Sequence, residues 1–167
     1  MEVSGTFSVP SMTERRIVIG GYNTAWDMKE LNIEQYASGG KLRLYINRGE
    51  INSYSDLLPA NALISFSYSY NPKTGKHTYS ANGENKTIQY QISGKSELTE
   101  KLFNDNRGYT GWGTGLKIYG ITIKNGRTYM DFVPVLDPNG EPAMLDKINQ
   151  VLYYNAGRGS FTTDKGP

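Results

Sequence analysis

The amino-acid sequence predicts an all-β protein built as an antiparallel sandwich of two sheets, and three observations favour this fold class. Short runs of alternating apolar and polar residues recur along the chain, without helical patterns of about 10 to 15 residues between them. Asn-Gly pairs at 82–83 and 125–126 lie between such runs, and Asn-Gly favours the tight turn of a β-hairpin. The 13 Tyr and 19 Gly residues favour strands and turns over helices.

The bulk properties indicate one domain over residues 1–167, with a tail at 162–167. A domain of this length buries roughly 70% of its unfolded surface, so it can form an ordinary core. The chain has no Cys, which excludes disulfides and thiolate metal sites. Its 18 basic residues are scattered among 16 acidic ones, so no basic patch indicates nucleic-acid binding. Without a long apolar run or a signal peptide, we expect a soluble protein that does not bind membranes.

Three strands are expected in the first 50 residues. Residues 2–9 alternate with Val3, Phe7 and Val9 on one face, and residues 17–22 are a short apolar run closed by glycines. A loop over 23–30 should follow, with a helix over 25–36 as the competing interpretation. Residues 41–47 alternate strictly, which predicts a half-exposed strand. Its inward residues would be Leu42, Leu44 and Ile46, and its outward residues Lys41, Arg43, Tyr45 and Asn47.

A three-stranded meander is predicted next. In residues 62–70 serines alternate with aromatic residues, so the two kinds should occupy opposite faces of a strand. A turn at 71–75 leads to a strand at 76–80, and the turn at Asn82-Gly83 leads to a strand at 87–92. Residues 98–103 are expected to form another short strand or a turn.

Two successive hairpins are expected over residues 116–161. Pairing outward from Asn125-Gly126 places Ile121 opposite Met130 and Tyr119 opposite Phe132 on a buried face, with Ile123 opposite Thr128. Residues 137–140, Asp-Pro-Asn-Gly, have the residue order of a type I turn, and further strands should follow it. The expected core of the whole domain includes Ile121, Met130, Phe132, Leu42, Leu44, Phe66 and Ile88.

The same region carries a family resemblance over about a quarter of the chain. It runs from the hairpin through Asp131-Phe132-Val133-Pro134-Val135, the Asp-Pro-Asn-Gly turn and Leu145-Asp146 to Tyr154-Asn155-Ala156-Gly157-Arg158-Gly159-Ser160-Phe161. This order resembles the C-terminal signature of the concanavalin A-like, laminin-G-like jelly-roll domains of phage tail and prophage-associated proteins. The family's opening motif, similar to Gln-Tyr-Ile-Asp-Thr-Gly, has no counterpart in residues 1–10. We therefore expect a first strand that is truncated or diverged, and a sheet edge that another polypeptide covers.

The resemblance implies a lectin-like jelly-roll sandwich, excised from a larger protein of the virion tail or of the bacterial cell surface. The function it implies is non-enzymatic recognition of bacterial surface glycan. Other virion or tail proteins are further implied partners, and the parent protein would set the oligomeric state, for example a trimer. The alternative is a purely structural virion module that contacts only other proteins.

The acidic and histidine residues do not predict an enzyme. A retaining glycosidase needs two carboxylates about 5 Å apart, usually from a Glu-x-Asp-x-x-Glu strand, and the chain has no such spacing. The nearest groupings, Asp27 with Glu30 and Glu97 with Glu100, lie in expected loops. His77 is the only histidine and is most simply a sheet residue, so a glycoside hydrolase is the minority interpretation.

No cofactor is expected. Asn104, Asp105 and Asn106 offer oxygen ligands of the kind that bind calcium, but Asp and Asn also favour turns, and a calcium site would carry more carboxylates. We therefore interpret the three residues as a turn and calcium as the weaker alternative.

The expected ligand site combines two polar loops that each contain a tryptophan. An aromatic ring beside amides and carboxylates suits a sugar, whose CH face stacks on the ring while its hydroxyls form hydrogen bonds. If the loops form one site, Trp26, Tyr109 or Trp112 would stack on a sugar ring. Its hydroxyls would then bond to Asp27, Asn104, Asp105 and Arg107. The competing interpretation is that both tryptophans cover the ends of the core.

Overall fold

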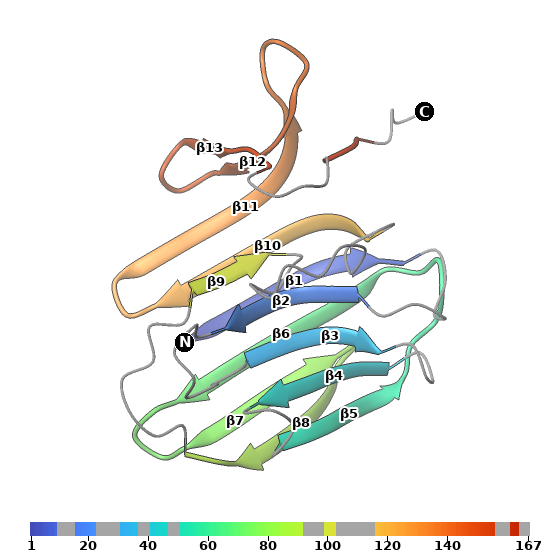
Figure 1. Cartoon of the computed structure of the whole chain (residues 1–167), viewed down its shortest axis with the longest axis vertical. Coiled ribbons are helices and arrows are strands. Elements are labelled where there is room, and N and C mark those ends of the chain that lie inside the picture. The colour runs from blue at the N-terminus through green and yellow to red at the C-terminus, as the bar shows by residue number, and fades with distance from the viewer. Residues whose placement is uncertain are drawn as a thin grey trace.

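The domain is an antiparallel two-sheet structure, shown as a computed structural model in Figure 1. The residues described are 1–9, 16–22, 31–36, 41–46, 51–91, 99–102, 116–155 and 161–163. Within these ranges the chain forms strands and no helix. The all-β prediction is thereby confirmed, whereas the jelly-roll type stays a prediction.

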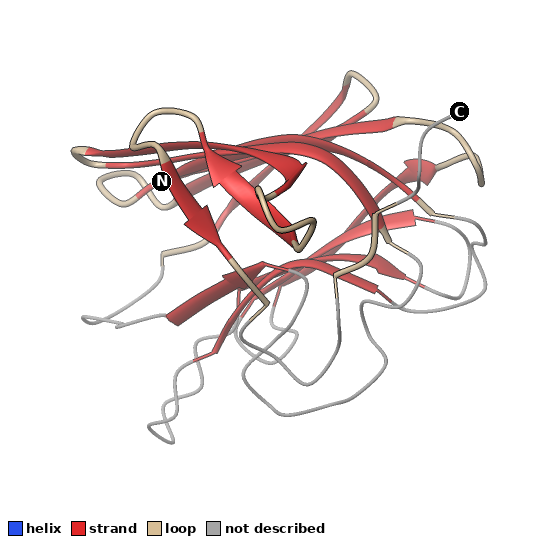
Figure 2. Ribbon diagram, turned by 90° about the horizontal axis from the view of Figure 1, so that it is seen from above, coloured by secondary structure: helices blue, strands red, loops and turns tan. Residues whose placement is uncertain are grey.

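The strands divide into two sheets that lie face to face (Figure 2). The eight-stranded sheet has the order β13-β12-β11-β10-β1-β6-β7-β8, and the five-stranded sheet has the order β5-β4-β3-β2-β9. The bounds are β1 Glu2–Ser8, β2 Arg16–Tyr22, β3 Leu31–Tyr36, β4 Lys41–Ile46, β5 Ile51–Leu57, β6 Ile64–Asn71, β7 Lys76–Ala81, β8 Glu84–Gln89, β9 Thr99–Leu102, β10 Lys117–Asn125, β11 Thr128–Leu136, β12 Pro142–Asp146 and β13 Val151–Tyr153.

Two strands of the five-stranded sheet were not among the predicted ones. β3 occupies the second half of the region where a helix was the competing interpretation, so the helix is wrong over residues 31–36. Leu31 and Ile33 alternate with polar residues, which is the period of a strand. β5 is mostly polar and pairs with β4, so its apolar pattern was too weak to indicate a strand.

The core lies between the sheets. Leu44 and Leu58 meet the inward side chains of the eight-stranded sheet in one cluster, which includes Val3, Phe7, Ile64, Phe66, Tyr68, Tyr79, Ile121, Phe132 and Met144. Of the predicted core residues, Ile121, Phe132, Leu44 and Phe66 are buried, and Met130 and Ile88 pack against the cluster partly buried. The side chain of Leu42 lies outside the described part of the chain.

The burial of Arg43 contradicts the prediction that β4 is half exposed. Arg43 was expected to face solvent, but only 6% of its surface is exposed. Strict alternation separates the two faces of a strand without showing whether the second face is also covered.

The two Asn-Gly pairs adopt different turns. Asn82 and Gly83 both have positive φ, 50° and 89°, and lie between the paired Ala81 and Glu84, as a type I′ turn requires. In the β10–β11 hairpin Asn125 pairs with Thr128, and only Gly126, at φ 59°, is left-handed. A two-residue turn that begins with glycine needs positive φ only there.

The register of the β10–β11 hairpin is therefore shifted by two residues from the predicted register. Ile121 lies opposite Phe132, and Ile123 lies opposite Met130. Because side chains alternate with a period of two, this shift leaves Ile121, Ile123, Met130 and Phe132 on the expected face.

A β-bulge overturns the predicted burial of Tyr119. Thr6 pairs with Gly120 and Phe7 pairs with Ile118, so Tyr119 is the extra residue of β10. An extra residue reverses the alternation of the strand beyond it. Ile118 consequently packs against the core, while Tyr119 is 50% exposed.

Candidate functional site

The face of the eight-stranded sheet that points away from the five-stranded sheet is lined by short polar side chains. We call it the outer face. On β1, Val3 and Phe7 point into the core, so Ser4 and Thr6 point outward; on β6, Phe66 and Tyr68 point inward and the serines outward. The serine and aromatic alternation predicted for residues 62–70 is confirmed by this arrangement.

One line of side chains crosses five strands of the outer face. The strand registers place Ser80, Ser67, Ser4, Thr122 and Asp131 side by side on β7, β6, β1, β10 and β11, and we call this line the hydroxyl row. The Oγ atoms of Ser67 and Ser80 lie 2.8 Å apart. Thr122 Oγ1 donates to Asp131 Oδ1 at 3.4 Å. The row thus presents a hydroxyl on each of four strands and a carboxylate on the fifth, at one end.

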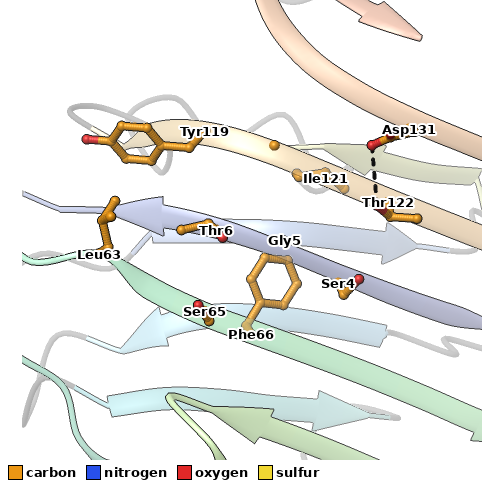
Figure 3. Close-up of a pocket in the computed structure, with 11 residues that line it drawn as sticks. Ser4, Gly5, Thr6, Leu63, Ser65, Phe66, Tyr119, Ile121, Thr122 and Asp131 are labelled. Atoms are coloured by element: carbon orange, nitrogen blue, oxygen red, sulfur yellow. Dashed lines mark hydrogen bonds between the residues drawn. The ribbon is translucent and has the colours of Figure 1, made fainter. Parts of the chain in front are cut away.

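An open depression of about 500 Å³ lies over part of this row (Figure 3). Tyr119 stands at one end of it, and the Thr122–Asp131 pair lies at the other. A hydrogen-bonding contact of 3.3 Å joins the hydroxyl of Tyr119 to Ser8 Oγ and holds the ring at its outer end. The lining consists of Ser4, Gly5, Thr6, Leu63, Ser65, Phe66, Tyr119, Gly120, Ile121, Thr122 and Asp131.

Two glycines shape the floor of the depression in different ways. A Cβ atom on Gly5 would lie 2.5 Å from the Gly120 carbonyl oxygen and 3.0 Å from the Phe66 ring, so glycine is required there for β1 and β10 to approach. A Cβ atom on Gly120 would meet only the Phe132 carbonyl oxygen, at 3.4 Å. Packing therefore permits a side chain at position 120, and the absence of that side chain leaves the depression open.

Asp131, the carboxylate of the site, forms an ion pair with a lysine from the turn between β12 and β13. Lys147 Nζ lies 2.6 Å from Asp131 Oδ2, and the two side chains are 48% and 25% exposed. The Lys147 amide also donates to the Asp131 carbonyl oxygen at 2.8 Å. This end of the depression can accept hydrogen bonds through Asp131 and donate them through Lys147, without a net side-chain charge.

Buried Asp146 holds that turn in place. Its Oδ1 atom accepts hydrogen bonds from the amides of Asp131 and Ile148, at 3.1 and 3.0 Å, and its Oδ2 atom accepts one from the Asn149 side chain. Burial alone would raise the pKa of Asp146, but these hydrogen bonds outweigh it and keep the pKa below its usual value.

His77 is a structural residue of the sheet interior, as its position between Lys76 and Thr78 predicted. It is fully buried and stacks on Tyr70 with ring centroids 4.4 Å apart. Nε2 donates to the Tyr90 carbonyl oxygen at 2.9 Å, so Nδ1 is the acceptor for the Tyr68 hydroxyl at 2.9 Å. Burial lowers the pKa of His77, and the Tyr90 hydrogen bond offsets this only in part. With both nitrogens engaged, His77 is not placed to activate a nucleophile.

The loop residues predicted to bind sugar all lie outside the described residues, so their roles stay predictions. They are Trp26, Asp27, Asn104, Asp105, Arg107, Tyr109 and Trp112. The same holds for Asn106 of the calcium alternative; within the described ranges no group of three or more His, Cys, Asp or Glu could hold a metal. The chain enters residues 23–30 from Tyr22 and enters residues 103–115 from Leu102. Tyr22 and Leu102 lie at opposite ends of the β2–β9 pairing.

The depression itself was not predicted. The serine pattern of β6 was readable, but the bulge that turns Tyr119 outward arises from the pairing of β1 with β10, two strands more than 100 residues apart in the chain. The local residue pattern around Tyr119 carries no signal for it.

Comparison with known proteins adds no family to these observations: no protein-family model and no curated protein matches the chain. Within the described residues, no helix is long and apolar enough to cross a membrane.

Proposed function

We propose that this domain is a non-enzymatic recognition module that binds carbohydrate in the depression between Tyr119 and Asp131. The single observation that carries the proposal is the open, hydroxyl-lined surface with an exposed aromatic ring at one end and an ion-paired carboxylate at the other. A sugar presents a CH face that can stack on such a ring and hydroxyls that can bond to Ser, Thr and Asp.

The geometry suits recognition of a ligand at the surface. The depression is shallow and open, and a hydroxyl both donates and accepts, so a sugar hydroxyl can find a partner at Ser4, Thr6 or Ser65. The Ser8 contact orients Tyr119 before a ligand binds, which reduces the entropy lost on binding.

The biological setting follows from the sequence resemblance to the jelly-roll domains of phage tail and prophage proteins. We propose that the glycan is a bacterial cell-surface carbohydrate, and that the domain belongs to a tail or tail-associated protein that acts outside the cell. The loop residues Trp26 and Trp112 remain candidates for a second contact with the same glycan.

A glycan array of bacterial surface oligosaccharides, probed with the domain, tests the proposal. Tyr119→Ala should weaken binding to the strongest array ligand at least about tenfold, which is ~1.4 kcal/mol. Tyr129→Ala is the matched control, because Tyr129 is 44% exposed yet does not line the depression. An array without binding, or equal loss in both variants, would contradict a site at Tyr119.

A structural role is the second candidate, and one observation favours it. Large apolar side chains are exposed on and around β11, β12 and β13: Leu136, Ile148, Val151, Tyr153 and Tyr154. Such a group suits contact with another virion protein. This candidate predicts an array without binding, together with self-association or particle incorporation that Val151→Ser and Tyr153→Ser weaken. Binding to the array that these two substitutions leave unchanged would favour carbohydrate recognition.

A further inference from the structure

Resting on the proposed function, we infer that the ligand is an extended, uncharged polysaccharide that runs along β1 and β6 and occupies a second depression on the same face. The inference concerns the length and charge of the glycan. It therefore goes beyond the statement that a sugar binds near Tyr119.

The second depression lies on the opposite side of the hydroxyl row from Tyr119. It has a volume of about 410 Å³ and is lined by Met1, Glu2, Ser69, Tyr70, Asn71, Pro72, Lys76 and Thr78. Glu2, Ser69 and Thr78 are cross-strand neighbours on β1, β6 and β7. This line runs two residues along the strands from Ser4, Ser67 and Ser80 of the hydroxyl row, so the two depressions share one face.

Only short side chains separate the two depressions. The sheet surface between the two depressions carries the side chains of Ser4 and Ser67, and Ser80 is hydrogen-bonded to Ser67. A chain molecule can therefore pass from one depression to the other without meeting a bulky side chain.

The separation of the two depressions along β6 sets the length of the ligand. From Ser65 of the first depression to Asn71 of the second, β6 advances six residues at about 3.3 Å each, or roughly 20 Å in total. A ligand that fills both depressions is therefore a chain of several sugar rings and not a single sugar.

The side-chain charges of the two depressions argue for an uncharged chain. The first contains the ion pair of Asp131 and Lys147, and the second contains one acid, Glu2, and one base, Lys76. Neither depression has an excess of positive side chains that would attract a polyanion.

Isothermal titration with β-1,4-linked N-acetylglucosamine oligomers of one to six units tests the inference. Affinity should rise at least tenfold from the disaccharide to the hexasaccharide and level off once the chain spans both depressions. Equal affinity for both oligomers would overturn the extended ligand while leaving carbohydrate recognition intact. Failure of every oligomer to bind, with binding of a polyanionic glycan instead, would overturn the uncharged chain. The proposed function itself fails if the array shows no binding, or if Tyr119→Ala weakens binding no more than Tyr129→Ala does.

A pair of lysine variants locates the second contact. Lys76→Ala should weaken the hexasaccharide several-fold and leave the disaccharide unchanged, because only the longer chain reaches the second depression. Lys73→Ala is the matched control, since Lys73 is an exposed lysine of the neighbouring turn that does not line the depression. Hexasaccharide affinity that is unchanged in Lys76→Ala, or lowered equally in both variants, would overturn the second contact.

Discussion

His77 should make the stability of the domain depend on pH in a range where few other side chains titrate. It is the only histidine, and the side chains around its ring are the uncharged Tyr68, Tyr70 and Tyr90. Nδ1 accepts the Tyr68 hydroxyl hydrogen, so a proton on Nδ1 would break that hydrogen bond and place a charge in a fully buried ring.

The sign of the effect follows from the lowered pKa of His77. Below the ordinary value of 6.5, the unfolded chain binds a proton that the folded protein does not bind. Stability contributed by neutral His77 is therefore fully present above pH 6.5 and is lost as the pH falls through the folded-state pKa. For one proton, the loss between pH 7 and pH 5 is at most about 2 kcal/mol, and less where water screens the imidazolium.

Urea denaturation at half-unit steps from pH 7 to pH 5 measures this dependence. The free energy of unfolding of the wild-type domain should fall over this range, whereas that of His77→Gln should be lower at pH 7 and nearly flat. The variant separates His77 from the carboxylates, which titrate mainly below this range. A wild-type stability that does not change between pH 7 and pH 5, or an equal slope in the variant, would refute the assignment of a neutral, buried histidine.

Three further changes test the packing that supports the site. Gly5→Ala should destabilise the domain by about 1 to 3 kcal/mol in a thermal melt, because its Cβ meets the Gly120 backbone; Gly120→Ala should leave the melt within about 0.5 kcal/mol and is the control. Asp146→Ala should lower the melting temperature more than Asp137→Ala: each carboxylate accepts two backbone amides, but Asp146 is fully buried, whereas water can replace the more accessible Asp137 carboxylate; equal effects would contradict this. Finally, an N-terminal extension that supplies the expected missing strand should raise the melting temperature, and no gain would count against a covered sheet edge.

The sequence allowed most strands with one apolar face to be predicted, although β3 was missed while Leu31 and Ile33 alternate with polar residues. β1, β4, β6 and the β10–β11 hairpin carry a period of two, and their inward residues Phe7, Leu44, Phe66 and Ile121 are buried. β5 escaped prediction because it is mostly polar and is positioned by pairing with β4. Periodicity reports an apolar face, so it does not detect a strand whose sequence lacks one.

The candidate site was harder to predict than the core. Its serines are visible in the sequence, but alternation alone does not distinguish a binding surface from an ordinary solvated face. Tyr119 depends on a bulge between strands that are distant in the chain, and Lys147 reaches Asp131 only because Asp146 fixes the following turn. These are tertiary effects, and local residue patterns do not determine them.

The composition of the outer face is itself an argument for binding. A solvated sheet face is commonly covered by long charged side chains, which shield the backbone and oppose association. Here the central strands β1 and β6 present Ser4, Thr6, Ser65 and Ser67 instead. Short hydroxyls lose little side-chain entropy on contact with a ligand, and each can donate and accept a hydrogen bond. A surface with these properties is poorly suited to repelling other molecules and well suited to holding a hydroxyl-rich chain, which is the reason to look for the ligand on this face.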